Sequence, residues 1–158
     1  YIKAGSISMS NLTPEEAYNF VVNLGLKRDQ RSEQIIMTDS QWAYRYAAHI
    51  IEGRFPEAEQ YIMKDPKWAY RYAAHIIKGR FPEAEPVIMI VPVWACLYAN
   101  GVIKGKFPEA EPYIMENPNW AYWYAKYIIK GRWMEAEPYI MKDPQLWVQY
   151  KMQFNIDV

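Results

Sequence analysis

The sequence is poor in the residue types from which most catalytic and metal sites are built. Its 158 residues include one cysteine and two histidines, so it holds no internal disulfide and no cysteine–histidine cluster for zinc. It also lacks a glycine-rich phosphate loop and a nucleophile at a recognisable spacing from a base. We therefore predict a protein that is not an enzyme and that needs no cofactor or metal.

A surplus of charge and long apolar runs are missing as well. Eighteen basic and eighteen acidic residues cancel, whereas nucleic-acid binders usually carry a basic surplus. No run approaches the roughly 18 apolar residues of a membrane span, and the first residues lack the layout of a signal peptide. The lone Cys96 fits a buried hydrophobe in a reducing compartment better than a nucleophile. We expect a soluble, cytoplasmic protein without membrane contact.

What the sequence does contain is a repeat. Four tryptophans follow one another at steps of 26 residues (68 − 42, 94 − 68 and 120 − 94): Trp42, Trp68, Trp94 and Trp120. A fixed period of roughly 20 to 50 residues is the signature of a solenoid or array. The pattern predicts an all-α fold, an α/α solenoid of two-helix repeats, with a flexible arm at 1–12 and one domain over 13–158. The repeats have these ranges: 13–38, 39–64, 65–90, 91–116, 117–142 and, in part, 143–158.

Each repeat is expected to hold a longer helix A and a short helix B. In the repeat at 65–90, Asp65–Pro66 combine an N-cap with a proline in the first turn, and Gly79 is the expected left-handed terminator of helix A. Helix B should begin near Pro82. Pro86 follows four residues later, so helix B must be short or kinked, although Gln60 at the equivalent place of the preceding repeat shows that the kink is not obligatory.

The first repeat differs from the others. Thr13-Pro14-Glu15-Glu16 reads as a capping box, but Glu16 stands where the other repeats have tryptophan, and Lys27 stands where they have glycine. This divergence predicts an end cap, because a terminal repeat must not display the inner apolar face.

Counting each repeat from its cap residue separates two sides of helix A. Positions four, five, eight, nine, twelve and thirteen stay nearly constant over 39–142 and predict the core side, with alanines that let helices approach and large aromatic side chains between them. Positions three, seven, ten, eleven and fourteen change and cover an arc of about 100° on the opposite side; we call them the variable face. This variation has two explanations, drift on a solvated surface and a binding surface of the kind solenoids use.

The residues of the variable face favour binding. In the first two full repeats they are polar and cationic, whereas in the next two Leu97 and Trp123 replace the arginine at position seven. Ile90 and Val91 also replace the usual Lys-Asp junction, which gives up a helix cap worth about 1 kcal/mol and indicates an apolar patch that a partner covers. The predicted partner-binding residues are Arg45, His49, Arg71, His75, Val93, Leu97, Trp123 and Tyr127. A homodimer is a second hypothesis, formed through Ile90, Val91, Val93 and Leu97 or through the C-terminal Met152 and Ile156.

Two further patterns argue against catalysis and metal binding. A basic residue precedes a Glu-x-Glu pair in every full repeat, and four equal copies indicate ion pairs and helix-dipole matching instead of acid–base catalysis. His49 and His75 stand one repeat apart, roughly 9–10 Å by ordinary helix packing, which is too far for both to ligate one zinc. Weak nucleic-acid binding remains an alternative, with stacking on Trp123 and Tyr127 and with cations at Arg45, Arg71, Lys78, Lys104 and Lys130.

The unit W-A-Y-x-Y-A-x-x-I-I-x-G-R-[FW]-P-E-A-E-x-Y-I-M-x-D-P resembles a short helical repeat of uncharacterised proteins from tailed phages and related bacterial elements. The resemblance covers 39–142 well and the flanking segments weakly. It implies a viral accessory protein that engages a host protein in the cytoplasm of the producing or infected cell. We predict a non-enzymatic protein-interaction module; the alternatives are a self-assembling structural repeat protein and a weak nucleic-acid-binding solenoid.

Overall fold

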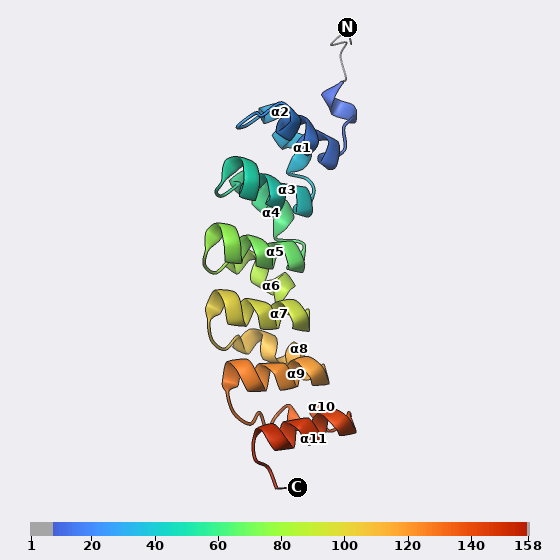
Figure 1. Cartoon of the computed structure of the whole chain (residues 1–158), viewed down its shortest axis with the longest axis vertical. Coiled ribbons are helices and arrows are strands. Elements are labelled where there is room, and N and C mark those ends of the chain that lie inside the picture. Colours follow the sequence, from blue (N-terminus) through green and yellow to red (C-terminus); the bar gives the residue numbers. More distant parts are fainter. Residues whose placement is uncertain (1–7, 158) are drawn as a thin grey trace. The chain divides into compact units, whose positions relative to one another are not determined.

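The computed structural model describes residues 8–157, and over that range the chain forms helices and no strand (Figure 1). The fold is an α/α solenoid of two-helix repeats, as the 26-residue period predicts. The chain divides into two compact units, Tyr1–Lys78 and Gly79–Val158. The boundary separates helix A from helix B of the repeat at 65–90, and the single domain over 13–158 stays a prediction. Between residues 8 and 157, no helix has the length and apolar character that crossing a membrane requires.

The first unit begins with a short turn of 3-10 helix, η1 (Met9–Asn11), inside the segment predicted as a flexible arm; residues 1–7 of that arm lie outside the described residues. Thr13 caps the first α-helix with the predicted capping box, since its side chain accepts from the Glu16 amide and Glu16 accepts from the Thr13 amide. The helices that follow are α1 (Pro14–Asn23), α2 (Gln30–Ile36), α3 (Ser40–Tyr46), η2 (Ala47–Ile51), α4 (Pro56–Ile62), α5 (Pro66–Tyr72) and η3 (Ala73–Ile77).

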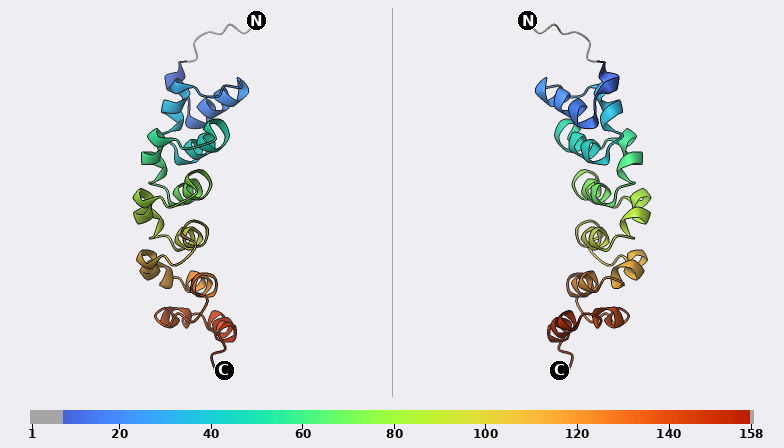
Figure 2. Two further views of the ribbon diagram at one scale, coloured as in Figure 1. Left: turned by 90° about the vertical axis from the view of Figure 1, so that its left-hand side faces the viewer. Right: turned by 90° about the vertical axis from the view of Figure 1, so that its right-hand side faces the viewer.

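The second unit repeats this order from helix B of the third repeat onward. Its elements are η4 (Pro82–Ala84), α6 (Glu85–Ile88), α7 (Pro92–Tyr98), η5 (Ala99–Ile103), η6 (Pro108–Ala110), α8 (Glu111–Met115), α9 (Pro118–Tyr124), η7 (Ala125–Ile129), α10 (Glu137–Ile140) and α11 (Pro144–Gln153). Within each unit, successive A helices contact one another, α3 with α5 and α7 with α9, and the B helices form a second layer beside them (Figure 2).

Most of the constant positions of helix A are buried in the core, as predicted. The alanines at positions five and nine and the tyrosine at position eight are fully buried in every repeat from 39 to 142. The second half of each of these repeats adds an alanine and an isoleucine, such as Ala58 and Ile62 in α4, whereas α2 of the first repeat has Ser32 in place of the alanine. The isoleucines at twelve and thirteen are half-buried instead, and of the four tryptophans only Trp68 counts as buried. Small residues therefore make the closest helix contacts, and the tryptophans line the edge of the core.

Helix A ends differently from the prediction that places Gly79 in the left-handed conformation. The left-handed residue is Lys78, with φ 56°, and Glu52, Lys104 and Lys130 occupy the same position in their repeats. The reason is that in these four repeats the last turn of helix A widens into a π-helix, so the chain reverses one residue before the glycine. The prediction for the glycines is therefore wrong.

Helix B confirms the predicted effect of proline. In α4, where Gln60 follows four residues after Pro56, the helix is continuous from Pro56 to Ile62. In the next repeat Pro86 has no amide to donate to the Pro82 carbonyl, and a 3-10 turn, η4, precedes a four-residue α6. Pro86 thus changes the first turn of helix B from α-helix to 3-10 helix, while helix B still begins at the equivalent proline, Pro56 or Pro82.

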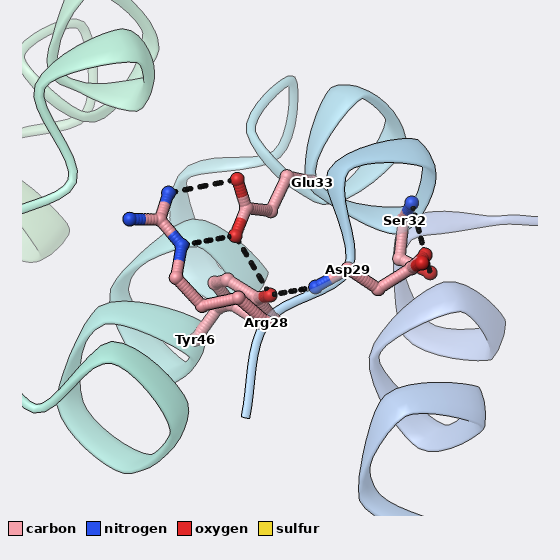
Figure 3. A network of polar contacts seen from close by, with 5 residues as sticks. All are labelled: Arg28, Asp29, Ser32, Glu33 and Tyr46. Carbon is pink, nitrogen blue, oxygen red and sulfur yellow. Dashed lines mark hydrogen bonds and ion pairs between the residues drawn. The ribbon is translucent and has the colours of Figure 1, made fainter. Parts of the chain in front are cut away.

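A tyrosine on helix A joins that helix to the preceding repeat by hydrogen bonds that were not predicted from the sequence; we call this contact the tyrosine junction. The hydroxyl of Tyr46 accepts from the backbone amide of Asp29 at 3.1 Å and donates to Oε1 of Glu33 at 2.9 Å (Figure 3). The Arg28 guanidinium donates two hydrogen bonds to the same carboxylate. The same junction recurs at Tyr72 with Phe55 and Glu59, Tyr98 with Phe81 and Glu85, Tyr124 with Phe107 and Glu111, and Tyr150 with Trp133 and Glu137.

Arginine supports four of these five junctions. The glutamate of the junction is the second residue of the Glu-x-Glu motif in the full repeats. It forms an ion pair of 2.6–2.8 Å with an arginine at four junctions, namely with Arg28, Arg54, Arg80 and Arg132. The arginine hydrogen bond holds the pKa of Glu33, Glu85 and Glu137 below the usual range. In the fourth repeat the residue is Lys106, and within residues 8–157 it forms no ion pair with Glu111. The predicted ion pairs are thus present except at this junction.

Candidate binding surface

None of the eight predicted partner-binding residues is buried. Arg45, His49, His75 and Tyr127 are exposed, and Arg71, Val93, Leu97 and Trp123 are half-buried. The variable face of each unit is therefore accessible, as the arc at positions three, seven and eleven predicts. Whether it binds a partner stays a prediction.

In the first unit the arginines of the variable face cover tryptophans. The guanidinium of Arg45 lies 4.7 Å from the ring centre of Trp42, and that of Arg71 lies 5.0 Å from Trp68. A tyrosine at position six of the preceding repeat contacts the same indole, as Tyr44 does with Trp68 at 5.4 Å. Cation–π contacts at exposed sites contribute about 0.5–1 kcal/mol. These arginines consequently have a packing role besides any role in binding.

The two histidines have different surroundings. Both side chains are exposed, but Nδ1 of His75 also lies 2.9 Å from the hydroxyl of Tyr44, at hydrogen-bond distance, while His49 lies on η2. Among residues 8–157 no group of three or more His, Cys, Asp or Glu side chains is arranged to hold a metal ion. His75 is thus part of the packing between repeats, and His49 faces solvent.

In the second unit an aromatic row replaces the arginine cover. Cys96 stands at position six, where the other full repeats have tyrosine, and Trp123 stands at position seven. Trp123 meets Trp120 edge-on with ring centres 5.7 Å apart, and Tyr127 tilts against Trp123 at 5.0 Å. We call Trp120, Trp123 and Tyr127 the aromatic row; Tyr127 at its outer end keeps 47% of its surface exposed.

Cys96 is confirmed as a buried hydrophobe. It is a free thiol with no exposed surface, and burial raises its pKa to about 12. Its Sγ lies 3.8 Å from the carbonyl oxygen of Trp120. In the first unit the tyrosine at position six packs against the tryptophan of the next repeat. Cys96 has no ring to place against Trp120, and the ring of Trp123 packs against that indole instead.

The apolar start of α7 is also as predicted. Val91 takes the N-cap position and provides no side-chain hydrogen bond, whereas Asp39, Asp65, Asn117 and Asp143 do so in their repeats. Ile90 is 49% exposed, and Val91, Val93 and Leu97 are half-buried. The second unit therefore presents an apolar patch next to an uncapped helix.

The C-terminal residues named for a dimer differ in exposure. Met152 on α11 is 68% exposed, whereas Ile156 is half-buried and its amide donates to the Lys151 carbonyl at 2.9 Å. Met152 is therefore free to contact another molecule, and Ile156 belongs partly to the end of its own helix. The dimer itself stays a prediction.

Each unit has a hollow at the C-terminal ends of two successive A helices. The register positions are the same in both: ten, fourteen and fifteen of one repeat and eleven, twelve and fourteen of the next. The first hollow, of about 350 Å³, is lined by Ala48, Glu52, Gly53, His75, Ile76 and Lys78. The second, of about 180 Å³, is lined by Asn100, Lys104, Gly105, Tyr127, Ile128 and Lys130. Lys78, Lys104 and Lys130 were predicted only as cations for nucleic acid, because the sequence pattern does not reveal a concave site at the helix ends.

No protein-family model matches the chain, and neither a curated protein nor a solved structure matches it. The resemblance to short helical repeats of tailed phages stays a prediction. The proposed function therefore rests on the geometry of the two variable faces.

Proposed function

We propose that the chain is a non-enzymatic protein-interaction module that binds a partner protein through the variable face of its A helices. The observation that carries this proposal is the aromatic row of the second unit. Trp123 and Tyr127 lie in contact on the accessible side of helix A, with Tyr127 47% exposed. Aromatic side chains of this kind dominate the binding energy of protein interfaces, because they bury a large area at a small cost in conformational entropy.

The second unit is a better anchor site than the first. The arginines of the first unit already lie over the tryptophans of their own helices. In the second unit, Leu97 at position seven of the preceding repeat adds a half-buried apolar side chain to the same face. Interface centres are depleted in charge, and polar residues gather at the rim. We place the centre of the interface on Leu97, Trp123 and Tyr127.

The direct test removes Leu97 and Tyr127 and leaves Trp123 in place against Trp120. Leu97→Ala and Tyr127→Ala are combined in one variant, and Tyr113→Ala serves as the control, because Tyr113 is an exposed tyrosine of the second unit that lies on helix B (α8) and not on the variable face. A partner isolated from the source cells with the wild-type chain is purified, and its dissociation constant is measured by calorimetry. We expect at least a tenfold weaker affinity for the double variant, about 1.4 kcal/mol or more, and no change for the control.

Circular dichroism should show the same helix content in all three proteins. If the double variant binds the purified partner as tightly as the wild type, the variable face of the second unit is not the binding surface and its divergence is drift. The resemblance to phage repeats adds the proposal that the partner belongs to a host cytoplasm, and the test does not depend on it.

Self-assembly is the second candidate, favoured by the exposed Ile90 beside the uncapped α7. The second copy would cover the patch of Ile90, Val91, Val93 and Leu97, or Met152 at the C-terminal end. Light scattering after size exclusion measures the mass directly. A monomer at micromolar concentration excludes this candidate, and a dimer that Ile90→Lys dissociates supports it.

A further inference from the structure

The hollow of the second unit adjoins the aromatic row. Tyr127 belongs to both, since its ring contacts Trp123 and it also lines the hollow with Ile128 and Asn100. At about 180 Å³ the hollow is smaller than the roughly 300–1,000 Å³ of small-molecule sites. It therefore fits one short side chain of a segment that lies along the aromatic row, and does not fit a whole small-molecule ligand.

The lining of this hollow is cationic. Lys104 and Lys130 contribute two positive charges, and no carboxylate stands among its residues. Over the described part of the chain neither lysine forms an ion pair, because every pair found there joins an arginine to a glutamate. The equivalent hollow of the first unit carries Glu52 with Lys78 and so has no such excess.

The fold does not require lysine at these places. Lys104 and Lys130 both have φ 59° at the end of an A helix, where a cation suits the negative end of the helix dipole. Glu52 takes the same position with φ 56° in the first unit, against the dipole. Lysine is thus common at this position but not required by the backbone, and of the two hollows the second holds two lysines, whereas the first holds one lysine and Glu52.

We propose that the Lys104–Lys130 hollow holds a carboxylate of the partner, so that the docking segment carries an acidic side chain next to an apolar one. This inference rests on the proposed function. The apolar residue would lie on the aromatic row, and the acidic residue would enter the hollow, since Tyr127 borders both. A paired lysine charge attracts a carboxylate over several ångströms and adds specificity to an otherwise apolar contact.

An acidic polypeptide fits better than a nucleic acid. Residues 79–158 hold eight basic and nine acidic residues, a net charge of −1, so the unit has no basic surplus. Nucleic acid binds through many phosphate contacts and a basic surplus over the domain. A single acidic side chain needs only the two lysines.

The test compares three fluorescein-labelled 12-residue peptides that share leucines and tryptophans at fixed positions and carry glutamate, glutamine or lysine at the others. Anisotropy is measured with the full chain at low and at high salt. We expect the glutamate peptide to bind at least tenfold more tightly than the glutamine peptide, with most of the advantage lost at high salt. The lysine peptide should bind most weakly.

The key variant is Lys104→Glu, which gives the second hollow the charge arrangement of the first. It should abolish the preference for glutamate over glutamine. Lys64→Glu is the control, since it changes the net charge equally on an exposed residue of the first unit. Thermal unfolding verifies that both variants fold.

Three outcomes overturn the inference: equal affinity for the glutamate and glutamine peptides, an unchanged preference in Lys104→Glu, or tighter binding of a labelled 20-nucleotide poly-dT through the same lysine. The last result would replace the acidic peptide by nucleic acid. Failure here is separable from failure of the proposed function. If Leu97→Ala/Tyr127→Ala loses the purified partner while Lys104→Glu keeps it, the interaction surface stands and only the acidic segment is wrong.

Discussion

The variable faces of the two units carry different side chains on the same scaffold. Both units have a tryptophan at position four, buried alanines at five and nine, and a tyrosine junction at eight. In the first unit Arg45 and Arg71 cover the tryptophans and His75 contacts Tyr44. In the second, the aromatic row takes that place and the lysines of the hollow stay unpaired.

The difference shows that the residue at position seven has a packing role in both units. A guanidinium covers the indole in one, and the Trp123 ring covers it in the other. Replacement of arginine by tryptophan therefore does not by itself demonstrate binding, because either side chain shields the core edge. Packing does not explain the exposed Tyr127 or the cationic hollow beside it. The two proposals are therefore based on these features.

The largest effect should come from breaking the tyrosine junction in each unit. Tyr124→Phe removes the acceptor of the buried Phe107 amide and the donor to Glu111. We expect it to lower the free energy of unfolding by about 1–3 kcal/mol, as for other buried polar groups left without a partner. Tyr46→Phe should cost less, because the Asp29 amide is only partly buried and Arg28 still holds Glu33. Urea unfolding measures both.

Tyr122→Phe is the control, because its hydroxyl forms no hydrogen bond in the region between residues 8 and 157. A cost for Tyr124→Phe no larger than that of this control would show that the junction contributes nothing to stability.

A smaller effect is expected from restoring the cap of α7. Val91→Asp supplies the N-cap side chain that the other full repeats have at this position and should raise the free energy of unfolding by about 1 kcal/mol. If the apolar patch is part of the interface, the same variant weakens partner binding while it stabilises the fold. Val93→Asp introduces the charge without the cap. Equal stability changes for the two variants would contradict a capping effect.

The smallest effect concerns the lysine junction. Lys106→Arg should allow a bidentate pair with Glu111 and raise stability by about 0.2–1 kcal/mol at neutral pH. The paired glutamates elsewhere have lowered pKa values, so their ionised form favours the folded state. That stability is present above the unfolded pKa near 4.5 and is lost as the pH falls through the lower folded value.

The gain of Lys106→Arg should therefore disappear in acid. Thermal midpoints of the variant and the wild type are compared between pH 7 and pH 3, with Lys104→Arg as the control for a lysine-to-arginine change outside the junction. A gain that is as large at pH 3 as at pH 7 would mean that the pair with Glu111 is not its cause.

The repeat and its helices could be predicted from the sequence because their signals are local. Tryptophan spacing set the period, Asp65 and Pro66 marked the start of helix A, and Pro86 indicated the altered first turn of helix B. The end of helix A could not be read in the same way. A glycine after a helix usually adopts the left-handed conformation, but the π-helical turn places Lys78 there instead.

The candidate site was only half predictable. The accessible face follows from helical periodicity, so Leu97, Trp123 and Tyr127 were found. The tyrosine junction and the hollow depend on partners in the neighbouring repeat, which the pattern of helix A does not contain. One signal was available: a tyrosine at position eight and a glutamate at position twenty-one recur together in each full repeat after the first. Their shared recurrence pointed to a contact between repeats.

The tyrosine junction also bears on how the chain folds and how it arose. Its two hydrogen bonds join residues 13 and 17 positions apart, in both units. Such short loops are cheap to close, so contact order is low and folding can start at any junction and spread to its neighbours. Duplication of a 26-residue segment carries a complete tyrosine, amide and carboxylate set with it. The array can thus lengthen by one repeat while every existing junction is kept.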